Sequence, residues 1–289
     1  MPELPEVETV RRDVARGYVG RELEHLVVTG RRTVRRHRPE LLSTLDGSTL
    51  AGLGRHGKFL LFEWDDGRVL VGHLRMSGQL LAAQPGDPVA PHTHAVLAFK
   101  DAGELRFVDP RTFGELFLAG LGEEDGERQG APRTDVLGPR DRVAELRHLG
   151  PDALTVDWAH FQRALAGRRA PLKSLLVDQR VVAGIGNIYA DEIAFAARLR
   201  PDRPGGSLKR NDLQRLAEST RSVLGAAIAA RGSSLADEQY RDLFGVSGRY
   251  QLEHKVYDRL GQKCASCGHD IERVHFGAKS AYFCRKCQK

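Results

Sequence analysis

The chain opens with residues 1–6, MPELPE, and this stretch places a candidate reactive group at the start of a helix. Pro5, followed by the acidic residues Glu6 and Glu8, is typical of a first helical turn, where proline is tolerated and carboxylates face the positive end of the helix dipole. Valines at positions 7, 10 and 14 then recur at the spacing that buries one helix face. Residues 2 and 3 are therefore expected directly ahead of a packed helix.

Pro2 becomes the amino terminus if the initiator Met1 is removed, which a small second residue permits. Its nitrogen would then be a secondary amine with the pKa of an α-amino group, about 7.7–8, so that a useful fraction is unprotonated near neutral pH. Such an amine can attack an electrophilic carbon to form an iminium ion, and Glu3 beside it can move protons. An ordinary structural start to the chain is the alternative that this motif alone leaves open.

Length, charge and cysteine placement limit the class of protein. The 289 residues predict about two domains, and the net charge of +6 with a pI near 9.3 favours a polyanionic partner without requiring one. The charge is uneven, because five arginines fall within residues 31–38. No apolar run approaches the roughly 20 residues of a membrane span, and the acidic start is not a signal peptide. These features predict a soluble, cytoplasmic protein without a membrane partner.

Residues 20–118 read as β-rich. Segments 58–64 and 68–74 flank the turn 65–67, and segments 94–100 and 104–108 flank the turn 101–103, so each pair predicts a hairpin. Residues 115–118 form a further short strand. Several short strands joined by tight turns favour a β-sandwich or barrel over a parallel sheet. The Gly-rich and charged stretch 120–135 reads as a linker.

From about residue 150 the pattern becomes helical, with helices predicted at 157–166, 171–178 and 188–197. A long fourth helix is capped by Ser207 or Asn211 and closed by Gly232. Residues 184–187, GIGN, form a turn into the third helix rather than a dinucleotide fingerprint, because the third glycine and the preceding strand are missing. Backbone amides there could hold a phosphate, although an ordinary tight turn is the alternative.

The cysteines form one local site. Cys264 and Cys267 make one pair, Cys284 and Cys287 make another, and sixteen residues separate the pairs. This spacing is typical of a structural zinc ribbon with a closed tetrahedral site, so the zinc is not expected to be catalytic. The segment is too short for a core of its own, so metal binding would supply its folding free energy. An iron–sulfur cluster or redox-active pairs are the alternatives.

Two further groups of residues lie at strand ends and loop tips. Lys58 starts one strand of the first hairpin and His73 ends its partner. Met76, Arg111 and Phe113 follow in loops, where two apolar groups and a cation could unstack a base and satisfy its orphaned partner. Two core side chains and a surface arginine are the alternative reading of the last three.

Together these motifs resemble bacterial formamidopyrimidine-DNA glycosylases over nearly the whole chain. The resemblance is carried by residues 2–8 (PELPEVE), 73–78 (HLRMSG), 109–111 (DPR), 184–190 (GIGNIYA) and the four-cysteine ribbon. It implies an α+β multidomain fold. The expected parts are an N-terminal catalytic β-sandwich domain with a flanking helix (1–135), a helical helix–two-turn–helix DNA-binding domain (136–248) and a C-terminal zinc ribbon (249–289).

The resemblance also implies a bifunctional DNA glycosylase/AP lyase of base excision repair. Such an enzyme removes oxidised purines, 8-oxoguanine and formamidopyrimidines, from double-stranded DNA and also cleaves abasic sites. Pro2 would attack C1′ of the flipped nucleotide and form a Schiff base, Glu3 would protonate the sugar ring oxygen, and β,δ-elimination would cut the strand. Lys58 would complete the catalytic set and, with His73, contact phosphates beside the lesion.

Further DNA contacts follow from the same resemblance. Asn187 should hold a phosphate, Arg111 should face the cytosine left behind, and Met76 with Phe113 should fill the gap. Glu6 is a candidate contact to the flipped base. One structural Zn²⁺ is expected, no nucleotide cofactor is expected, and the reading needs only a monomer.

Two departures from the family pattern concern DNA contacts. Lys279 stands where the family usually places a ribbon arginine, so the charge is kept but the bidentate fork is lost. The segment 233–250, where the family carries its lesion-reading loop, does not align residue by residue.

Three competing functions remain open at this stage. An endonuclease VIII-like enzyme shares the Pro-Glu start but prefers oxidised pyrimidines, and its insertion residues differ from Met76, Arg111 and Phe113. A non-catalytic DNA-binding zinc protein would not need Pro2, Glu3 and Lys58 together. A β-rich metabolic enzyme with an appended ribbon would need a nucleotide or acid–base motif, and none is found.

Overall fold

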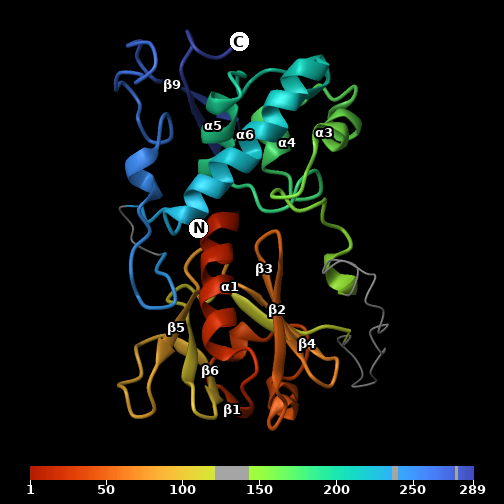
Figure 1. Cartoon of the computed structure of the whole chain (residues 1–289), viewed down its shortest axis with the longest axis vertical. Coiled ribbons are helices and arrows are strands. Elements are labelled where there is room, and N and C mark those ends of the chain that lie inside the picture. Colours follow the sequence, from red (N-terminus) through yellow and green to blue (C-terminus); the bar gives the residue numbers. More distant parts are fainter. Residues whose placement is uncertain (121–142, 236–239, 277–278) are drawn as a thin grey trace. The chain divides into compact units, whose positions relative to one another are not determined.

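The computed structural model describes residues 1–120, 143–235, 240–276 and 279–289, apart from the side chains of Arg31 and Lys279. The chain forms two compact units, which can be followed in Figure 1. Unit 1 contains Met1–His148 and Arg231–Arg249, and unit 2 contains Leu149–Ala230 and Tyr250–Lys289. No helix among the described residues is both long and apolar enough to cross a membrane. The predicted linker 120–135 lies outside the described residues except for Gly120.

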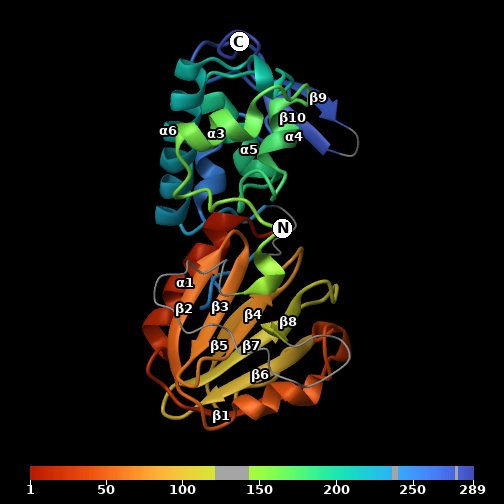
Figure 2. The same cartoon turned by 90° about the vertical axis from the view of Figure 1, so that its right-hand side faces the viewer.

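Unit 1 is built on two antiparallel four-stranded sheets, seen as two layers in Figure 2. The first sheet has the order β1 (Leu23–Val28), β6 (Thr93–Phe99), β7 (Gly103–Val108), β5 (Gln79–Ala83). The second has the order β2 (Leu50–His56), β3 (Phe59–Trp64), β4 (Val69–His73), β8 (Glu115–Leu118). Buried apolar side chains from both sheets, such as Leu60, Phe62 and Phe107, form one core. The predicted β-sandwich is confirmed.

Both predicted hairpins are present. β3 pairs with β4 and β6 pairs with β7, each in antiparallel register. Gly67 and Gly103, with φ of +85° and +79°, close the two turns in the left-handed region that glycine adopts without a Cβ penalty.

Helix α1 (Leu4–Tyr18) covers the sandwich, and its apolar stripe of Val7, Val10 and Val14 is part of the sandwich core. Buried Glu8 on the same helix accepts hydrogen bonds from Arg55 of β2 and from Arg11 and Arg12 of its own helix. Burial alone would raise the pKa of Glu8, but these guanidinium groups lower it to about 2. The start of the chain is therefore fixed by packing and by ion pairs.

The segment Arg231–Arg249 belongs to unit 1 although it follows the helices of unit 2 in sequence. Tyr240 and Leu243 are buried in the sandwich core. The carbonyl of Leu243 accepts a hydrogen bond from the amide of Ala82 on edge strand β5, at 2.8 Å. Core packing and this backbone bond hold the segment on the sandwich.

Unit 2 contains four α-helices among its described residues: α3 (Trp158–Leu165), α4 (Leu172–Leu176), α5 (Asn187–Ala196) and α6 (Arg210–Ala229). The two-stranded ribbon of β9 (Glu272–Phe276) and β10 (Lys279–Phe283) follows. The described elements of the two units also include five 3₁₀ turns. Three lie in unit 1, at Arg31–Thr33, Pro39–Leu45 and Ala144–Leu146, and two lie in unit 2, at Gly205–Ser207 and Tyr250–Glu253. The predicted caps of the fourth helix are wrong: Lys209 is the cap, and its amide donates to the Asp212 carboxylate at 3.1 Å.

Candidate functional site

The amino-terminal pair Pro2 and Glu3 is buried at the first turn of α1. The amide of Glu3 donates to Oε2 of Glu6 at 2.8 Å, and the side chain of Glu3 in turn accepts from the backbone amide of Glu6. This reciprocal arrangement is a capping box, which satisfies amides that a helix start would otherwise leave unpaired. The candidate nucleophile is thus attached to a rigid helix start rather than to a frayed end.

The second oxygen of Glu6 reaches a distant part of the chain. Its Oε1 accepts from the amide of Ser233 at 2.7 Å. Gly232, with φ of +81°, precedes this contact, and a Cβ added there would lie 2.7 Å from the same oxygen. Glycine is therefore required for the segment to approach Glu6 so closely.

Lys58 and His73 lie together at the ends of β3 and β4. Phe59 is the register partner of His73, and their rings meet edge to face at 4.4 Å. Burial, reinforced by the positive charges of Arg75 and Lys58, holds the pKa of His73 well below its ordinary value. Because Nδ1 accepts from the Arg75 amide at 2.8 Å, the proton of the neutral ring is on Nε2. His73 can therefore donate a hydrogen bond to a phosphate without carrying a charge.

Glu115 balances the arginines around this pair. It is the register partner of His73 on β8 and accepts from Arg36 at 3.0 Å and Arg75 at 3.1 Å. Burial would raise the pKa of Glu115, but the two arginines lower it. One carboxylate pairs with two arginines, so these three groups together carry a net positive charge, which suits a phosphate.

The predicted insertion residues project from two loops. Met76 is 40% exposed and Phe113 is 43% exposed, so neither is a core side chain. The Arg111 guanidinium lies over the Phe113 ring at 4.9 Å from its centroid. Two exposed apolar side chains and an adjacent cation match the chemistry of a base-displacing wedge.

A buried aspartate of the 109–111 motif joins these loops, a role that was not predicted from the sequence. Asp109 is fully buried, and its Oδ1 accepts from the Ser77 hydroxyl at 2.5 Å and from the Arg111 amide at 3.2 Å. Its Oδ2 accepts from the Gly114 amide at 2.7 Å. One carboxylate therefore fixes the position of the loop that carries Met76 relative to the loop that carries Arg111. Its position before a proline, in Asp109-Pro110, was the available signal of a structured turn.

Arginines of the 31–38 cluster have partners within unit 1. Arg35 donates to the carbonyls of Thr112 at 2.9 Å and Gly114 at 3.1 Å, which supports the Arg111 loop. Arg36 stacks 3.8 Å above the Phe117 ring as well as pairing with Glu115. These two arginines support the loop and strand beneath the wedge.

In unit 2, Asn187 is the first residue of α5, and its backbone carbonyl accepts from the Lys173 ammonium at 2.6 Å. Its side-chain Oδ1 is buried and has no hydrogen-bond partner within the described ranges. Rotation about the last side-chain bond exchanges the amide oxygen and nitrogen, so the same group can turn its NH₂ toward a phosphate.

Helix α5 joins the helical part of unit 2 to the ribbon through two buried acids. Asp191 accepts from Lys173 at 2.6 Å and from the Tyr282 amide of β10 at 3.0 Å. The neighbouring carboxylate, Glu192, accepts from the amides of residues 255, 256 and 257, between 2.8 and 3.0 Å. The position of Asn187 is therefore coupled to the position of the ribbon.

The four cysteines converge on one point, with all Sγ atoms within 4.8 Å of one another. Cys264 and Cys287 are 3.8 Å apart and Cys267 and Cys284 are 3.5 Å apart, between the sulfur atoms. A tetrahedral zinc with Zn–S bonds of about 2.3 Å requires sulfur separations of about 3.8 Å, so the residues fit the metal. All four positions are protein ligands, so the ion is structural.

The predicted site residues therefore fall in two groups. Unit 1 holds the amino-terminal pair, the Lys58–His73 pair and the wedge, and unit 2 holds Asn187 and the cysteines. Lys279 begins β10 opposite Phe276, but its side chain lies outside the described residues, as do residues 236–239 of the segment 233–250.

A β-sandwich with a buried Pro2–Glu3 pair, a helical unit and a four-cysteine ribbon together define a class of zinc-containing DNA glycosylases. Comparison with known sequences identifies the family. Residues 1–116 match the formamidopyrimidine-DNA glycosylase N-terminal domain, residues 149–239 match its H2TH domain, and residues 261–289 match the zinc finger found in FPG and IleRS.

Relatives match along the whole chain. A formamidopyrimidine-DNA glycosylase of Parafrankia sp. (strain EAN1pec) is 40% identical over 302 residues, covering 100% of this chain and 98% of the relative. The crystal structure of the MutM (Fpg) protein from Thermus thermophilus is similar with a TM-score of 0.80 and 38% identity, covering 99% of this chain and 98% of that one. Lactococcus lactis Fpg in complex with DNA containing N7-benzyl-Fapy-dG gives a TM-score of 0.84 at 32% identity, with full coverage of both chains. The chain belongs to the formamidopyrimidine-DNA glycosylase family.

Proposed function

We propose that the chain excises oxidised purines through the imino nitrogen of Pro2, with Glu3 as its proton-transfer partner. As a member of its family the chain is a DNA glycosylase with AP lyase activity in base excision repair, and damaged double-stranded DNA is its partner. The observation that supports the residue assignment is the capping box, in which Glu6 fixes the position of Glu3 directly beside Pro2. A nucleophile must be held close to its target for covalent catalysis to be efficient.

The proposed reaction begins after removal of Met1. The Pro2 nitrogen attacks C1′ of the flipped nucleotide, the C1′–N bond breaks, and the damaged base leaves with the electron pair and takes up a proton. Glu3 protonates the ring oxygen O4′, so the C1′–O4′ bond opens and an iminium ion forms. The iminium acidifies the C2′ proton, whose loss breaks the C3′–O3′ bond. A second proton loss from C4′ breaks the C5′–O5′ bond, and water then releases Pro2.

Positively charged and neutral donors are proposed to hold the strand. Lys58 and the neutral Nε2–H of His73 contact phosphates beside the lesion, and Asn187 and Lys279 contact others. Met76 and Phe113 fill the space of the flipped nucleotide, and Arg111 faces the base that remains. Glu6 is a candidate contact to the flipped base.

We also propose the wider organisation expected from the resemblance. The functional regions are residues 1–135 for catalysis, 136–248 for helical DNA binding and 249–289 for the zinc ribbon. The protein acts as a monomer in the cytoplasm on nucleoid DNA.

Borohydride trapping tests the proposed nucleophile. Reduction during reaction with an 8-oxoguanine:cytosine duplex should link the native protein covalently to DNA, and Pro2→Gly should abolish the adduct. Pro85→Gly, at an exposed loop position, is the matched control and should trap like the native protein. The mass of the adduct's amino-terminal peptide should lack Met1. An adduct that persists in Pro2→Gly would disprove the assignment, and a native protein that binds but never traps would indicate a non-catalytic DNA-binding protein.

Substrate choice has its own test. Excision from an 8-oxoguanine:cytosine duplex should be faster than from a thymine glycol:adenine duplex under single-turnover conditions. The reverse order would assign the chain the pyrimidine preference of endonuclease VIII.

A further inference from the structure

An arginine in an unusual backbone conformation lies where the segment Arg231–Arg249 leaves α6. Arg231 has φ of +62°, a left-handed conformation that is unfavourable for a residue with a Cβ atom. Arg231 is followed directly by Gly232 and Ser233, whose amide reaches Glu6. An unfavourable backbone persists only where surrounding interactions hold it, so the partners of this side chain are informative.

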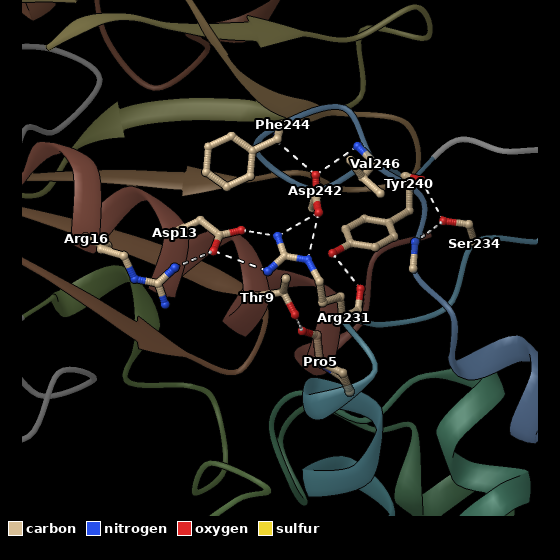
Figure 3. A network of polar contacts seen from close by, with 11 residues as sticks. Pro5, Thr9, Asp13, Arg16, Arg231, Ser234, Tyr240, Asp242, Phe244 and Val246 are labelled. Carbon is tan, nitrogen blue, oxygen red and sulfur yellow. Dashed lines mark hydrogen bonds and ion pairs between the residues drawn. The ribbon is translucent and has the colours of Figure 1, made fainter.

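The Arg231 side chain is held between two buried aspartates, as Figure 3 shows. Its Nη atoms pair with both carboxylate oxygens of Asp13 on α1. Its Nε donates to Oδ2 of Asp242 at 2.8 Å. Asp13 is 3% exposed and Asp242 is 1% exposed, so neither carboxylate can rely on water if the arginine is removed. We call these three residues the Arg231 cluster.

Asp242 extends the cluster into the following turn. Its Oδ1 accepts from the amides of Phe244 at 3.0 Å and Val246 at 2.9 Å. The Tyr240 hydroxyl donates to the carbonyl of Arg231 at 3.1 Å. The described residues on either side of 236–239 are therefore tied to the same arginine.

The two ends of the segment are also joined to each other. The Ser234 hydroxyl donates to the Tyr240 carbonyl at 2.8 Å and accepts from the Gly248 amide at 3.0 Å. The backbone at Gly248 passes so close to Gly232 that a side chain has no room, because a Cβ atom added to Gly248 would lie 2.3 Å from the carbonyl oxygen of Gly232. The result is a closed arrangement that is attached to α1 by the Arg231 cluster at one point and by the Ser233–Glu6 bond at another.

We propose that the Arg231 cluster is a positioning device for base excision: it holds residues 232–234 against Glu6, next to the catalytic terminus, so that this segment forms a fixed wall for the damaged base. The inference rests on the proposed roles of Pro2 and Glu3. The capping box between Glu3 and Glu6 is local to α1 and does not need the cluster. Loss of the cluster should therefore impair base capture while leaving the amino-terminal pair in place.

Abasic DNA separates the two effects, because an abasic sugar offers Pro2 an electrophile but has no base to capture. The test compares single-turnover excision on an 8-oxoguanine:cytosine duplex with nicking of a duplex that contains a preformed abasic site. Arg231→Lys keeps the charge but cannot reach both carboxylates with a planar fork. It should slow excision about tenfold or more and change nicking less than about twofold, since small misplacements near reacting groups have effects of this size.

Arg106→Lys is the matched control. Arg106 is 5% exposed in the same unit, pairs with Glu104 at 2.7 Å, and donates to the carbonyls of Asp87 and Pro88. Its loss should leave the ratio of excision to nicking unchanged. Both variants are assayed well below their measured melting temperatures, and Asp242→Asn serves as a second disruption of the cluster if Arg231→Lys fails to fold.

Amide hydrogen exchange supplies an independent readout. The Ser233 amide should exchange faster in Arg231→Lys than in the native protein and should be unchanged in Arg106→Lys. The inference would be overturned if Arg231→Lys slowed excision and nicking equally. It would also be overturned if this variant changed neither the protection of the Ser233 amide nor the ratio of excision to nicking. A native protein that neither excises nor nicks would instead contradict the proposed function.

Discussion

Glu6 uses its two carboxylate oxygens for two backbone amides that are far apart in sequence. One belongs to Glu3 at the start of α1 and the other to Ser233. A single residue thereby connects the helix cap with the segment that follows α6. A carboxylate is needed because both oxygens must accept.

Glu6→Gln should therefore destabilise the protein and slow base excision. The glutamine NH₂ cannot accept, so one buried amide loses its partner, at a cost of about 1–3 kcal/mol. Urea unfolding and single-turnover excision measure the two effects. Glu40→Gln, at an exposed position, is the control and should change neither. Unaltered stability in Glu6→Gln would show that the two hydrogen bonds are dispensable.

His73 makes stability depend on pH. Burial, Arg75 and Lys58 hold the pKa of His73 far below that of the unfolded chain, which is about 6.5. The unfolded state therefore binds a proton that the native state does not bind. The free energy of unfolding is highest above the pKa of the unfolded chain and falls as the pH drops below that value. Urea unfolding at pH 7.5 and 5.5 should show this loss in the native protein and a smaller loss in His73→Asn. Equal pH dependence in both proteins would contradict the assigned protonation state.

At the scale of elements, α5 is the helix on which unit 2 depends. Its first residue is the candidate phosphate contact Asn187, and its middle carries Asp191 and Glu192, which bind the ribbon strand and the segment before it. Lys173 of α4 completes this arrangement and is 1% exposed. Burial raises the pKa of Asp191, while the adjacent ammonium opposes that rise.

Lys173→Met should destabilise unit 2 by about 3–5 kcal/mol, because it leaves Asp191 buried without its counter-charge. The double variant Lys173→Met/Asp191→Leu should recover much of this loss, since an apolar pair of similar volume often replaces a buried ion pair at little cost. Chemical unfolding of both variants measures the difference. Lys255→Met, which breaks an exposed pair with Glu253, is the control and should cost less than about 1 kcal/mol. A single variant as stable as the control would refute the coupling.

At the scale of the whole molecule, the residues proposed for the site are divided between the two units. Unit 1 holds the proposed nucleophile, the wedge and the Arg231 cluster, and unit 2 holds the zinc ribbon. The ribbon core is small, consisting of Val256, Ile271 and two cysteines with a few partly buried neighbours. The zinc ion must therefore supply most of the folding free energy of this part.

Removal of zinc should abolish DNA binding while the sandwich stays folded. Loss of the metal can be confirmed by mass spectrometry, affinity measured by fluorescence anisotropy, and amide protection followed in residues 1–118. Protection there should persist, and readdition of zinc should restore affinity. Full affinity after confirmed metal loss would show that the ribbon is not needed for DNA binding.

Local sequence patterns were sufficient to predict many of the structural elements of this protein. The valine spacing of α1, the two hairpin turns and the paired cysteines were readable in sequence because each depends on neighbouring residues. The cap of α6 was missed, because Lys209 is not a favoured cap residue. Its backbone amide donates to the Asp212 carboxylate, and the Lys209 side chain makes no cap hydrogen bond.

The sequence by itself determined the family, the order of the elements, the zinc ligands and the identity of the candidate nucleophile. Only the tertiary structure decided that Asp109 joins the two wedge loops and that Arg231 joins Asp13 to Asp242. The contact between Arg231 and Asp13 spans 218 positions in the chain. Periodicity and spacing report contacts within a few residues, whereas contacts of this kind exist only after the core has brought distant segments together.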